Sequence, residues 1–167
     1  LDDILTATKG DLLSPFKNIS FRRISIDSRN TKKGDLFIAI KGAKFDGHDF
    51  CHSALKNGAD GVIISKNIPN IKKDKIVIKV KNTLNALHDI ALFHRSKFKI
   101  KIVAITGSSG KTTTKDMVAC VLATCGKTLK TKENLNNEIG TPLTLLKINS
   151  SHKFAVIEMG MQYQGDI

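Results

Sequence analysis

Short apolar runs, separated by glycine and polar turns, dominate the first part of the chain. They are rich in β-branched residues, which predicts strands at residues 21–26, 35–40, 61–65 and 75–80. Turn residues at Lys33-Gly34 and Asp46-Gly47 fit between them. Helical spacing predicts a short helix over residues 48–57, and a longer helix from a cap at Asn82 to about residue 97.

The pattern changes in the second part of the chain, where strands and helices alternate. Strands are predicted at residues 99–106, 128–130 and 154–157, and helices at residues 111–124 and 137–148. The end of the first strand and the whole of the last are continuously apolar, as in buried parallel strands. The fold class is therefore α/β, with a small mixed domain followed by the start of a parallel α/β domain.

Composition indicates a globular protein. Hydrophobic residues make up 41% of the chain and charged residues 25%, with a mean hydropathy of -0.11. No apolar run approaches the roughly 20 residues of a membrane helix, so we expect no membrane span. The acidic start, Leu1-Asp2-Asp3, is unlike a signal peptide. Three cysteines without C-x-x-C spacing favour a reducing, cytoplasmic setting.

The chain is strongly basic, with 27 Lys and Arg against 15 Asp and Glu and a formal net charge of +12. Such a charge attracts polyanions or phosphorylated substrates. However, the chain has one Tyr and no Trp, and no basic stretch is interleaved with aromatic residues, so we expect no nucleic-acid partner. Binding driven by charge alone remains an alternative, which a steep salt dependence would favour.

A glycine-rich segment, Thr106-Gly107-Ser108-Ser109-Gly110-Lys111-Thr112-Thr113, joins a predicted buried strand to a predicted helix. That context is typical of a phosphate-binding loop, although Ile105 stands where the strict motif has its first glycine. The glycines let backbone N–H groups turn toward an anion at the helix N-terminus. Lys111 can bridge the β- and γ-phosphates, and the Thr112 hydroxyl can hold Mg²⁺. The segment 107–113 therefore predicts a binding site for the phosphates of a nucleotide.

Glu158 ends the last predicted strand. In an open parallel sheet, the carboxyl ends of the strands lie at the edge that carries the phosphate loop. A carboxylate there can hold Mg²⁺ together with Thr112. The simpler alternative is a glutamate that faces solvent.

Several segments resemble the ATP-dependent Mur ligases of peptidoglycan synthesis. The first is the loop with the start of its helix, residues 106–117. The second, Asn134-Leu135-Asn136-Asn137-Glu138-Ile139-Gly140-Thr141-Pro142 with the following residues to 146, is similar to members that add D-alanyl-D-alanine. Members that add a diamino acid usually carry a different segment, with Thr and Pro. Residues 27–29, 33–42 and 46–48 resemble the uridine-nucleotide substrate domain that both kinds share.

The resemblance implies an ATP- and Mg²⁺-dependent ligase that joins D-alanyl-D-alanine to UDP-N-acetylmuramoyl-tripeptide through an acyl phosphate. It implies that residues 1–98 bind the UDP-linked substrate and that residues 99–167 begin the ATP-binding domain. The family's C-terminal domain would be absent, so we expect a fragment that is inactive alone. We also expect a monomer in the cytoplasm.

The resemblance further implies roles for individual residues. The catalytic residues would be Lys111, Glu158, Asn136 and Asn137. The residues that contact the UDP-linked substrate would be Ser28, Arg29, Lys41, Gly42, Asp46, Gly47 and His48. Structural alternatives stay open: an Asn can cap the following helix, Arg29 can pair with a nearby Asp, and residues 41–48 can form an ordinary turn.

Other functions are also open. The chain could belong to a diamino-acid-adding ligase, or to a nucleotide-binding module without ligase chemistry. Folate-polyglutamate ligases have a related loop but lack a first domain of this type. His48, Cys51 and His52 lie close enough in sequence to suggest a metal site, but a fourth ligand is not evident and helix packing is the simpler interpretation.

Overall fold

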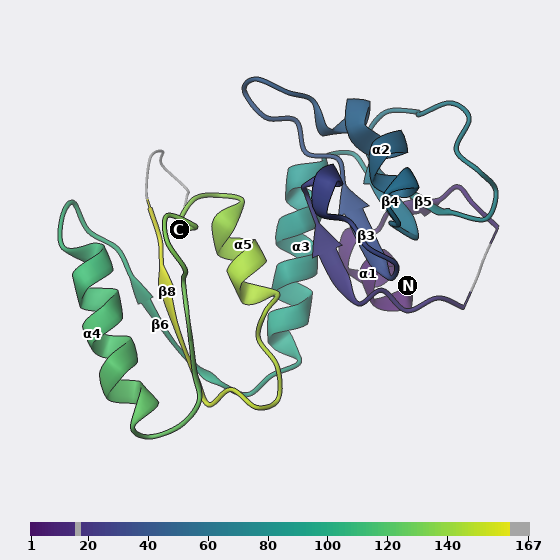
Figure 1. The fold of residues 1–167 in the computed structure, drawn as a ribbon. Helices are drawn as coiled ribbons and strands as arrows, with labels where there is room; N and C mark the ends of the chain where they lie inside the picture. Colours follow the sequence, from purple (N-terminus) through teal and green to yellow (C-terminus); the bar gives the residue numbers. More distant parts are fainter. Residues whose placement is uncertain (16–17, 161–167) are drawn as a thin grey trace. The chain divides into compact units, whose positions relative to one another are not determined.

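The computed structural model describes residues 1–15 and 18–160 and divides the chain into two compact units, Leu1–Ile90 and Ala91–Ile167. Figure 1 traces the chain through both units by colour. The division falls inside helix α3 (Thr83–Ser96), earlier than the expected boundary at 98/99. The second half of α3 belongs with the second unit, where His94 Nε2 donates to the carbonyl of Ile148 at 2.8 Å.

The first unit is built on a five-stranded sheet in the order β1-β5-β4-β3-β2. The strands are β1 (Asp11–Leu12), β2 (Arg23–Ser25), β3 (Asp35–Ile38), β4 (Gly61–Ile64) and β5 (Ile76–Lys79). Strands β2 to β5 run parallel, and they confirm the predicted strands, with the first one shortened. β1 pairs antiparallel with β5 and makes the sheet mixed. The sequence analysis did not predict β1, which is too short to show a periodic pattern.

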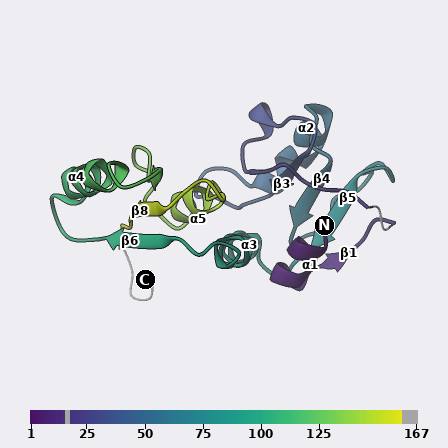
Figure 2. The same ribbon diagram turned by 90° about the horizontal axis from the view of Figure 1, so that it is seen from below.

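Helices cover both faces of this sheet. Figure 2 shows α1 (Asp2–Thr8) and α2 (Cys51–Lys56) on opposite sides of the strands. The sequence analysis also missed α1. The helix predicted over residues 48–57 begins instead as a 3₁₀ turn, η2 (Gly47–Phe50), because the Asp46 side chain accepts from the backbone N–H of His48 at 2.9 Å. A second 3₁₀ turn, η1 (Ser28–Asn30), follows β2.

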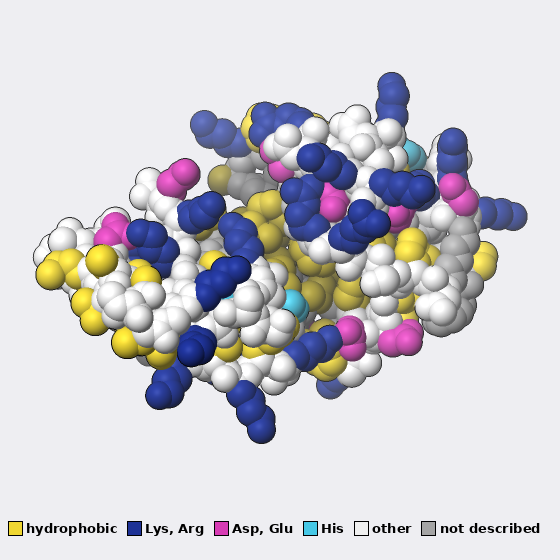
Figure 3. All heavy atoms as spheres, turned by 60° about the horizontal axis from the view of Figure 1, so that its bottom comes forward, with side chains coloured by type: hydrophobic (Ala, Val, Ile, Leu, Met, Phe, Trp, Pro, Cys, Tyr) yellow, Lys and Arg dark blue, Asp and Glu magenta, His cyan; other side chains and the backbone are white. Residues whose placement is uncertain are grey.

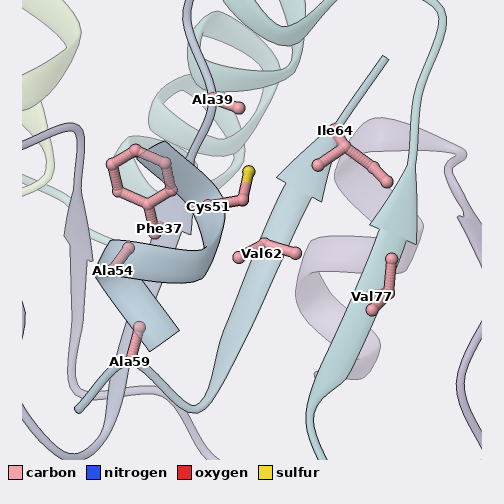
Figure 4. Packing of buried hydrophobic residues seen from close by; sticks show 8 residues of the cluster. All are labelled: Phe37, Ala39, Cys51, Ala54, Ala59, Val62, Ile64 and Val77. Atoms are coloured by element: carbon pink, nitrogen blue, oxygen red, sulfur yellow. The ribbon is translucent and has the colours of Figure 1, made fainter. Parts of the chain in front are cut away.

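One core cluster of the first unit lies between α2 and the parallel strands. Figure 4 shows side chains from β3, β4 and β5 directed toward those of α2. The cluster comprises Phe37, Ala39, Cys51, Ala54, Ala59, Val62, Ile64 and Val77. The residues that α2 contributes are small, so this short helix can approach the sheet closely.

The second unit contains a three-stranded parallel sheet in the order β6-β8-β7. Its strands are β6 (Lys101–Ile105), β7 (Thr128–Lys130) and β8 (Phe154–Glu158). Helix α4 (Lys111–Ala123) packs against all three strands, and α5 (Gly140–Leu145) lies against β8. The predicted alternation of parallel strands and helices is confirmed.

One expectation about the second unit was wrong in detail. The helix predicted over residues 137–148 is shorter, because Asn137 caps the chain just before α5 rather than joining it. The strand β6 is not buried on both faces: Val103 is 36% exposed and Ala104 is exposed as well. Within the described residues β6 is an edge strand that pairs with β8 alone. β8, in contrast, is buried from Ala155 to Glu158.

Charged side chains are spread over the surface that Figure 3 draws. Figure 3 shows Lys and Arg side chains scattered over one face with Asp and Glu among them, rather than gathered into one stripe. Within residues 1–15 and 18–160, no helix combines the length and apolar character that crossing a membrane requires.

Candidate functional site

The glycine-rich loop connects the end of β6 to the start of α4. Gly107 and Gly110 have φ of 150° and 75°, a region that side chains with a Cβ rarely adopt. Gly110 is the N-cap of α4, and a Cβ placed there would meet nothing within 4 Å, so the backbone conformation alone requires glycine. The loop is exposed and leads into the N-terminus of a long helix, where N–H groups are open to an anion.

Lys111 lies over this loop. Its ammonium donates to the carbonyl of Gly107 at 2.6 Å. The positive charge therefore stands beside the same backbone that would surround a phosphate. A phosphate oxygen can take the place of that carbonyl as acceptor.

Glu158 is brought next to the loop by strand pairing, because Glu158 is opposite Ile105 in the register of β8 and β6. Its side chain is buried, with 2% of the residue exposed. The Oε1 atom accepts from Thr112 Oγ1 at 3.3 Å and from Asn136 Nδ2 at 2.8 Å. The backbone N–H of Glu158 donates to the hydroxyl of the buried Thr131 at 2.9 Å. The structure thus unites Thr112, Asn136 and Glu158, three of the residues that sequence analysis selected.

The second carboxylate oxygen of Glu158 differs from the first. Oε2 is buried and has no hydrogen-bond partner among the described residues. Buried carboxylate oxygens without a partner are rare because desolvation is costly, and they often mark an ion or water site. Carboxylate and hydroxyl oxygens are the hard ligands that Mg²⁺ prefers. Glu158 and Thr112 therefore fit the metal that the resemblance implies.

Lys115 is the residue of this site that sequence analysis missed. It is 3% exposed, and its Nζ lies 3.7 Å from Glu158 Oε2. A lysine in the middle of a helix usually faces solvent. Helical spacing nevertheless held a signal, since Lys115 follows Thr112 by three residues and so shares its face of α4.

The two asparagines have different positions. Asn136 contacts Glu158 through its side chain, and its carbonyl accepts from the N–H of Gly160 at 2.7 Å. Asn137 Oδ1 accepts from the N–H groups of Gly140 at 2.8 Å and of Ile139 at 3.3 Å. Asn137 therefore caps the turn that leads into α5, close to the structural alternative considered from the sequence, and a catalytic role for it stays a prediction.

In the first unit, Arg29 is paired with its neighbour. Its Nε and Nη2 donate to the two oxygens of Asp27 at 2.9 and 2.8 Å, while the Asp27 side chain also caps η1. These hydrogen bonds from Arg29 lower the pKa of Asp27 to about 2. The Arg29 side chain is still 85% exposed. Ser28 is buried, and its carbonyl accepts from Asn57 Nδ2 at 3.0 Å.

The segment from Lys41 to His48 forms a closed turn. Lys41 and Asp46 form an isolated antiparallel bridge, and the N–H of Gly42 donates to the carbonyl of Phe45 at 2.9 Å. Gly47 lies so close to Ile40 that a Cβ would come within 2.7 Å of its backbone. The turn is therefore fixed by backbone contacts as well as by its side chains.

His48 is held at both ring nitrogens. Nε2 lies 2.9 Å from the backbone N of Ser65, and Nδ1 lies 2.6 Å from Asp46 Oδ1. Since a backbone N–H can only donate, Nε2 accepts and the ring proton faces Asp46. Hydrogen bonds from Lys66 and from the His48 backbone hold the pKa of Asp46 well below its ordinary value. Substrate binding by Asp46 and His48 stays a prediction, because both already have internal partners.

The His-Cys-His group does not form a metal site in this structure. Cys51 is buried in the core, and burial raises the pKa of its thiol to about 12. A thiol of that kind is a poor metal ligand. No cluster of three or more His, Cys, Asp or Glu suited to a metal ion occurs in the described part of the chain.

Family models match both units. Residues 20–95 match the model described as "Mur ligase family, catalytic domain", and residues 105–166 match "Mur ligase middle domain". The chain belongs to the Mur ligase family. The expectations about family and fold class are therefore confirmed.

Individual relatives agree with this assignment. The UDP-N-acetylmuramoyl-tripeptide–D-alanyl-D-alanine ligase of Synechocystis is 41% identical over 170 residues, which are 100% of this chain and 37% of that protein. A crystal structure of MurF from Acinetobacter baumannii has a TM-score of 0.92 and 36% identity, and the match covers 98% of this chain and 36% of that one. MurF from Thermotoga maritima in complex with ADP has a TM-score of 0.80 and 35% identity, with 90% and 35% covered. The chain spans about a third of the length of these relatives.

Proposed function

We propose that the complete gene product containing this chain is a ligase that joins D-alanyl-D-alanine to UDP-N-acetylmuramoyl-tripeptide and converts ATP to ADP and phosphate. The relatives that match nearly the whole chain are named for this pair of substrates, which supports the proposal. The observation that carries it is the convergence of Thr112, Asn136 and Lys115 on the buried Glu158 beside the phosphate loop.

The proposed reaction takes place in two steps. A carboxylate oxygen of the tripeptide attacks the γ-phosphorus of ATP, and ADP leaves. The amine of D-alanyl-D-alanine then attacks the carbonyl of the acyl phosphate, and phosphate leaves as the new amide loses a proton. Both steps bring anionic groups together, so positioning and charge neutralisation are the main tasks of the site.

We assign the residues of the second unit to ATP. The backbone of residues 107–113 would surround the phosphates, and Lys111 would exchange the Gly107 carbonyl for a phosphate oxygen. Thr112 and Glu158 would hold Mg²⁺, which when bound neutralises charge that develops on the transferred phosphoryl group. Asn136 holds Oε1 of Glu158 in place, and with Asn137 it would provide a neutral amide near the phosphates.

We assign the first unit to the UDP-linked substrate. Arg29 has an exposed side chain and could exchange Asp27 for a diphosphate. Ser28 is its neighbour on η1, and Lys41, Gly42, Asp46, Gly47 and His48 would form the turn that closes over the sugar or the diphosphate. The three free cysteines fit the expected cytoplasmic setting.

A product analysis tests this function. The complete gene product would receive ATP and Mg²⁺ with one of two substrate pairs, and the products would be identified by mass. One pair is UDP-muramoyl tripeptide with D-alanyl-D-alanine, and the other is UDP-muramoyl dipeptide with a diamino acid. We expect a pentapeptide product from the first pair alone, and none from a Lys111→Ala variant. A product from the second pair alone would contradict the proposal and favour a diamino-acid-adding ligase. No product from either pair, with ATP still bound, would favour a nucleotide-binding module.

A further inference from the structure

Lys115 and Glu158 form a pair of opposite charges in the interior of the second unit. Their side chains are 4% and 3% exposed, and Nζ lies 3.7 Å from Oε2. An unpaired charge at either position would be costly, because a buried ion loses its hydration. Each of the two charges can therefore be buried because the other lies beside it.

The other carboxylate near Lys115 already has a partner. Asp116 Oδ1 also lies 3.7 Å from Lys115 Nζ, but it accepts from Lys130 Nζ at 2.7 Å. The Asp116 side chain is 48% exposed, so water screens its charge, and the hydrogen bond from Lys130 lowers its pKa. Glu158 is thus the carboxylate whose charge Lys115 chiefly balances.

The separation in this pair leaves the carboxylate available. At 3.7 Å the ammonium neutralises Oε2 without making a normal hydrogen bond to it, so Oε2 can still accept a new ligand. Oε1, meanwhile, is held by Thr112 and Asn136. The carboxylate is therefore fixed in direction while Oε2 stays open to a new ligand.

We propose that Lys115 is a positioning residue that makes the binding of a divalent cation depend on nucleotide. Lys115 balances the charge of Glu158 while no nucleotide is bound. Its positive charge also repels a divalent cation that binds without a nucleotide. The inference rests on the proposed function, in which Thr112 and Glu158 hold the metal.

The charges at the site determine whether a nucleotide strengthens or weakens the binding of the cation. Lys111 and Lys115 carry two positive charges near the loop, and Glu158 carries one negative charge. A divalent cation alone therefore meets a net positive surrounding. A nucleotide adds several negative phosphate charges and reverses that balance. The cation therefore binds more tightly when the nucleotide is present, and the nucleotide binds more tightly when the cation is present.

Direct titration of Mn²⁺ tests the inference. Free Mn²⁺ would be measured by electron paramagnetic resonance at about pH 8, where carboxyl groups are ionised, on the complete gene product with and without ADP. For the unmodified protein we expect tight binding with ADP and at least about tenfold weaker binding without it. Equal Kd values in the two conditions would overturn the inference, and this arm requires no variant to fold.

Two variants separate a specific effect from a general change of charge. In Lys115→Met the Kd for Mn²⁺ without ADP should fall about tenfold, since one repelling charge is gone. Lys130→Met removes the same charge from the same unit but from the partner of Asp116, and should change that Kd by less than about twofold. Equal effects of the two variants would overturn the inference. A purely structural lysine would lower the thermal midpoint on replacement without tightening Mn²⁺ binding.

A third variant distinguishes failure of the inference from failure of the proposed metal site. Glu158→Gln should lose the tight binding of Mn²⁺ seen with ADP. If Glu158→Gln binds Mn²⁺ with ADP as the unmodified protein does, the metal assignment itself is wrong. If it loses binding while Lys115→Met behaves like Lys130→Met, only the role of Lys115 is wrong.

Discussion

The turn at residues 41–48 and the group around Glu158 are both rich in polar residues, but they differ in how these residues are satisfied. In the turn, Asp46 and His48 use their polar atoms on each other, on Lys66 and on Ser65. Around Glu158, one buried carboxylate oxygen has no hydrogen-bond partner among the described residues, and Lys111 donates to the backbone carbonyl of Gly107.

This difference separates two uses of the same residue types. A polar group that is fully paired within the chain stabilises a conformation, and a ligand must break that pairing to bind. A buried acceptor with an unused lone pair, beside an exposed glycine loop, offers binding energy without such a loss. The second unit is therefore prepared for a ligand in a way that the 41–48 turn is not.

The strongest test of the comparison is Lys111→Ala in the complete gene product. We expect kcat for ADP formation to fall about 10³-fold, because a charge that stabilises the transferred phosphoryl group is lost. Binding of UDP-muramoyl tripeptide, measured by calorimetry, should be unchanged. Lys132→Ala, an exposed lysine of the same unit, is the control. Equal loss of turnover and UDP-substrate binding would mean that the two units do not divide the substrates as proposed.

A substitution in the turn at residues 41–48 should lower the stability of the first unit. His48→Ala should lower the free energy of opening of the first unit by about 2–3 kcal/mol, because it leaves the Ser65 N–H without its acceptor and removes the ring N–H that Asp46 accepts from. Hydrogen exchange of the amides in β3 and β4 measures this. His52→Ala, an exposed histidine on α2, should change it by less than about 0.5 kcal/mol. Unchanged exchange together with weaker binding of the UDP-linked substrate would make His48 a ligand-binding residue after all.

Arg29 should show a smaller and different effect. Its exposed side chain can leave Asp27, so Arg29→Ala should weaken binding of UDP-muramoyl tripeptide about tenfold and change stability by less than about 0.5 kcal/mol. Calorimetric titration measures the affinity, with Arg22→Ala as the exposed control. If both variants bind the substrate as the unmodified protein does, Arg29 has only the structural role that its pairing with Asp27 indicates.

The smallest expected effect is the loss of the contribution of Asp27 to stability at acidic pH. The pKa of Asp27 is lowered from 3.8 to about 2 in the folded protein, so its contribution to stability is present above about pH 4 and is lost as the pH falls toward 2. The stability difference between the unmodified protein and Asp27→Asn should therefore shrink over that interval in pH-dependent unfolding. Asp74→Asn, an exposed carboxylate in the same unit, serves as the control. A difference that grows on acidification would contradict the pairing with Arg29.

Much of this molecule could be predicted from local sequence. The strands β3, β4, β5 and β8 show as apolar β-branched runs, and the glycine loop is visible because it lies between a strand and a helix. Glu158 could be placed beside that loop because parallel strands end at one edge of a sheet.

What could not be predicted depends on contacts between residues distant in sequence. His48 is paired with Ser65, which is 17 residues away, and no local pattern indicates that contact. The burial of Lys115 depends on β8, more than 40 positions later in the sequence (Lys115 to Glu158).

Hydrogen exchange with and without an Mg²⁺–ATP analogue, measured on the complete gene product, tests the central contrast most directly. The account predicts new protection of the amides in residues 106–115 and near Asn136 and Glu158, with no change in residues 41–48. Protection confined to residues 41–48, with none in the glycine loop, would contradict it.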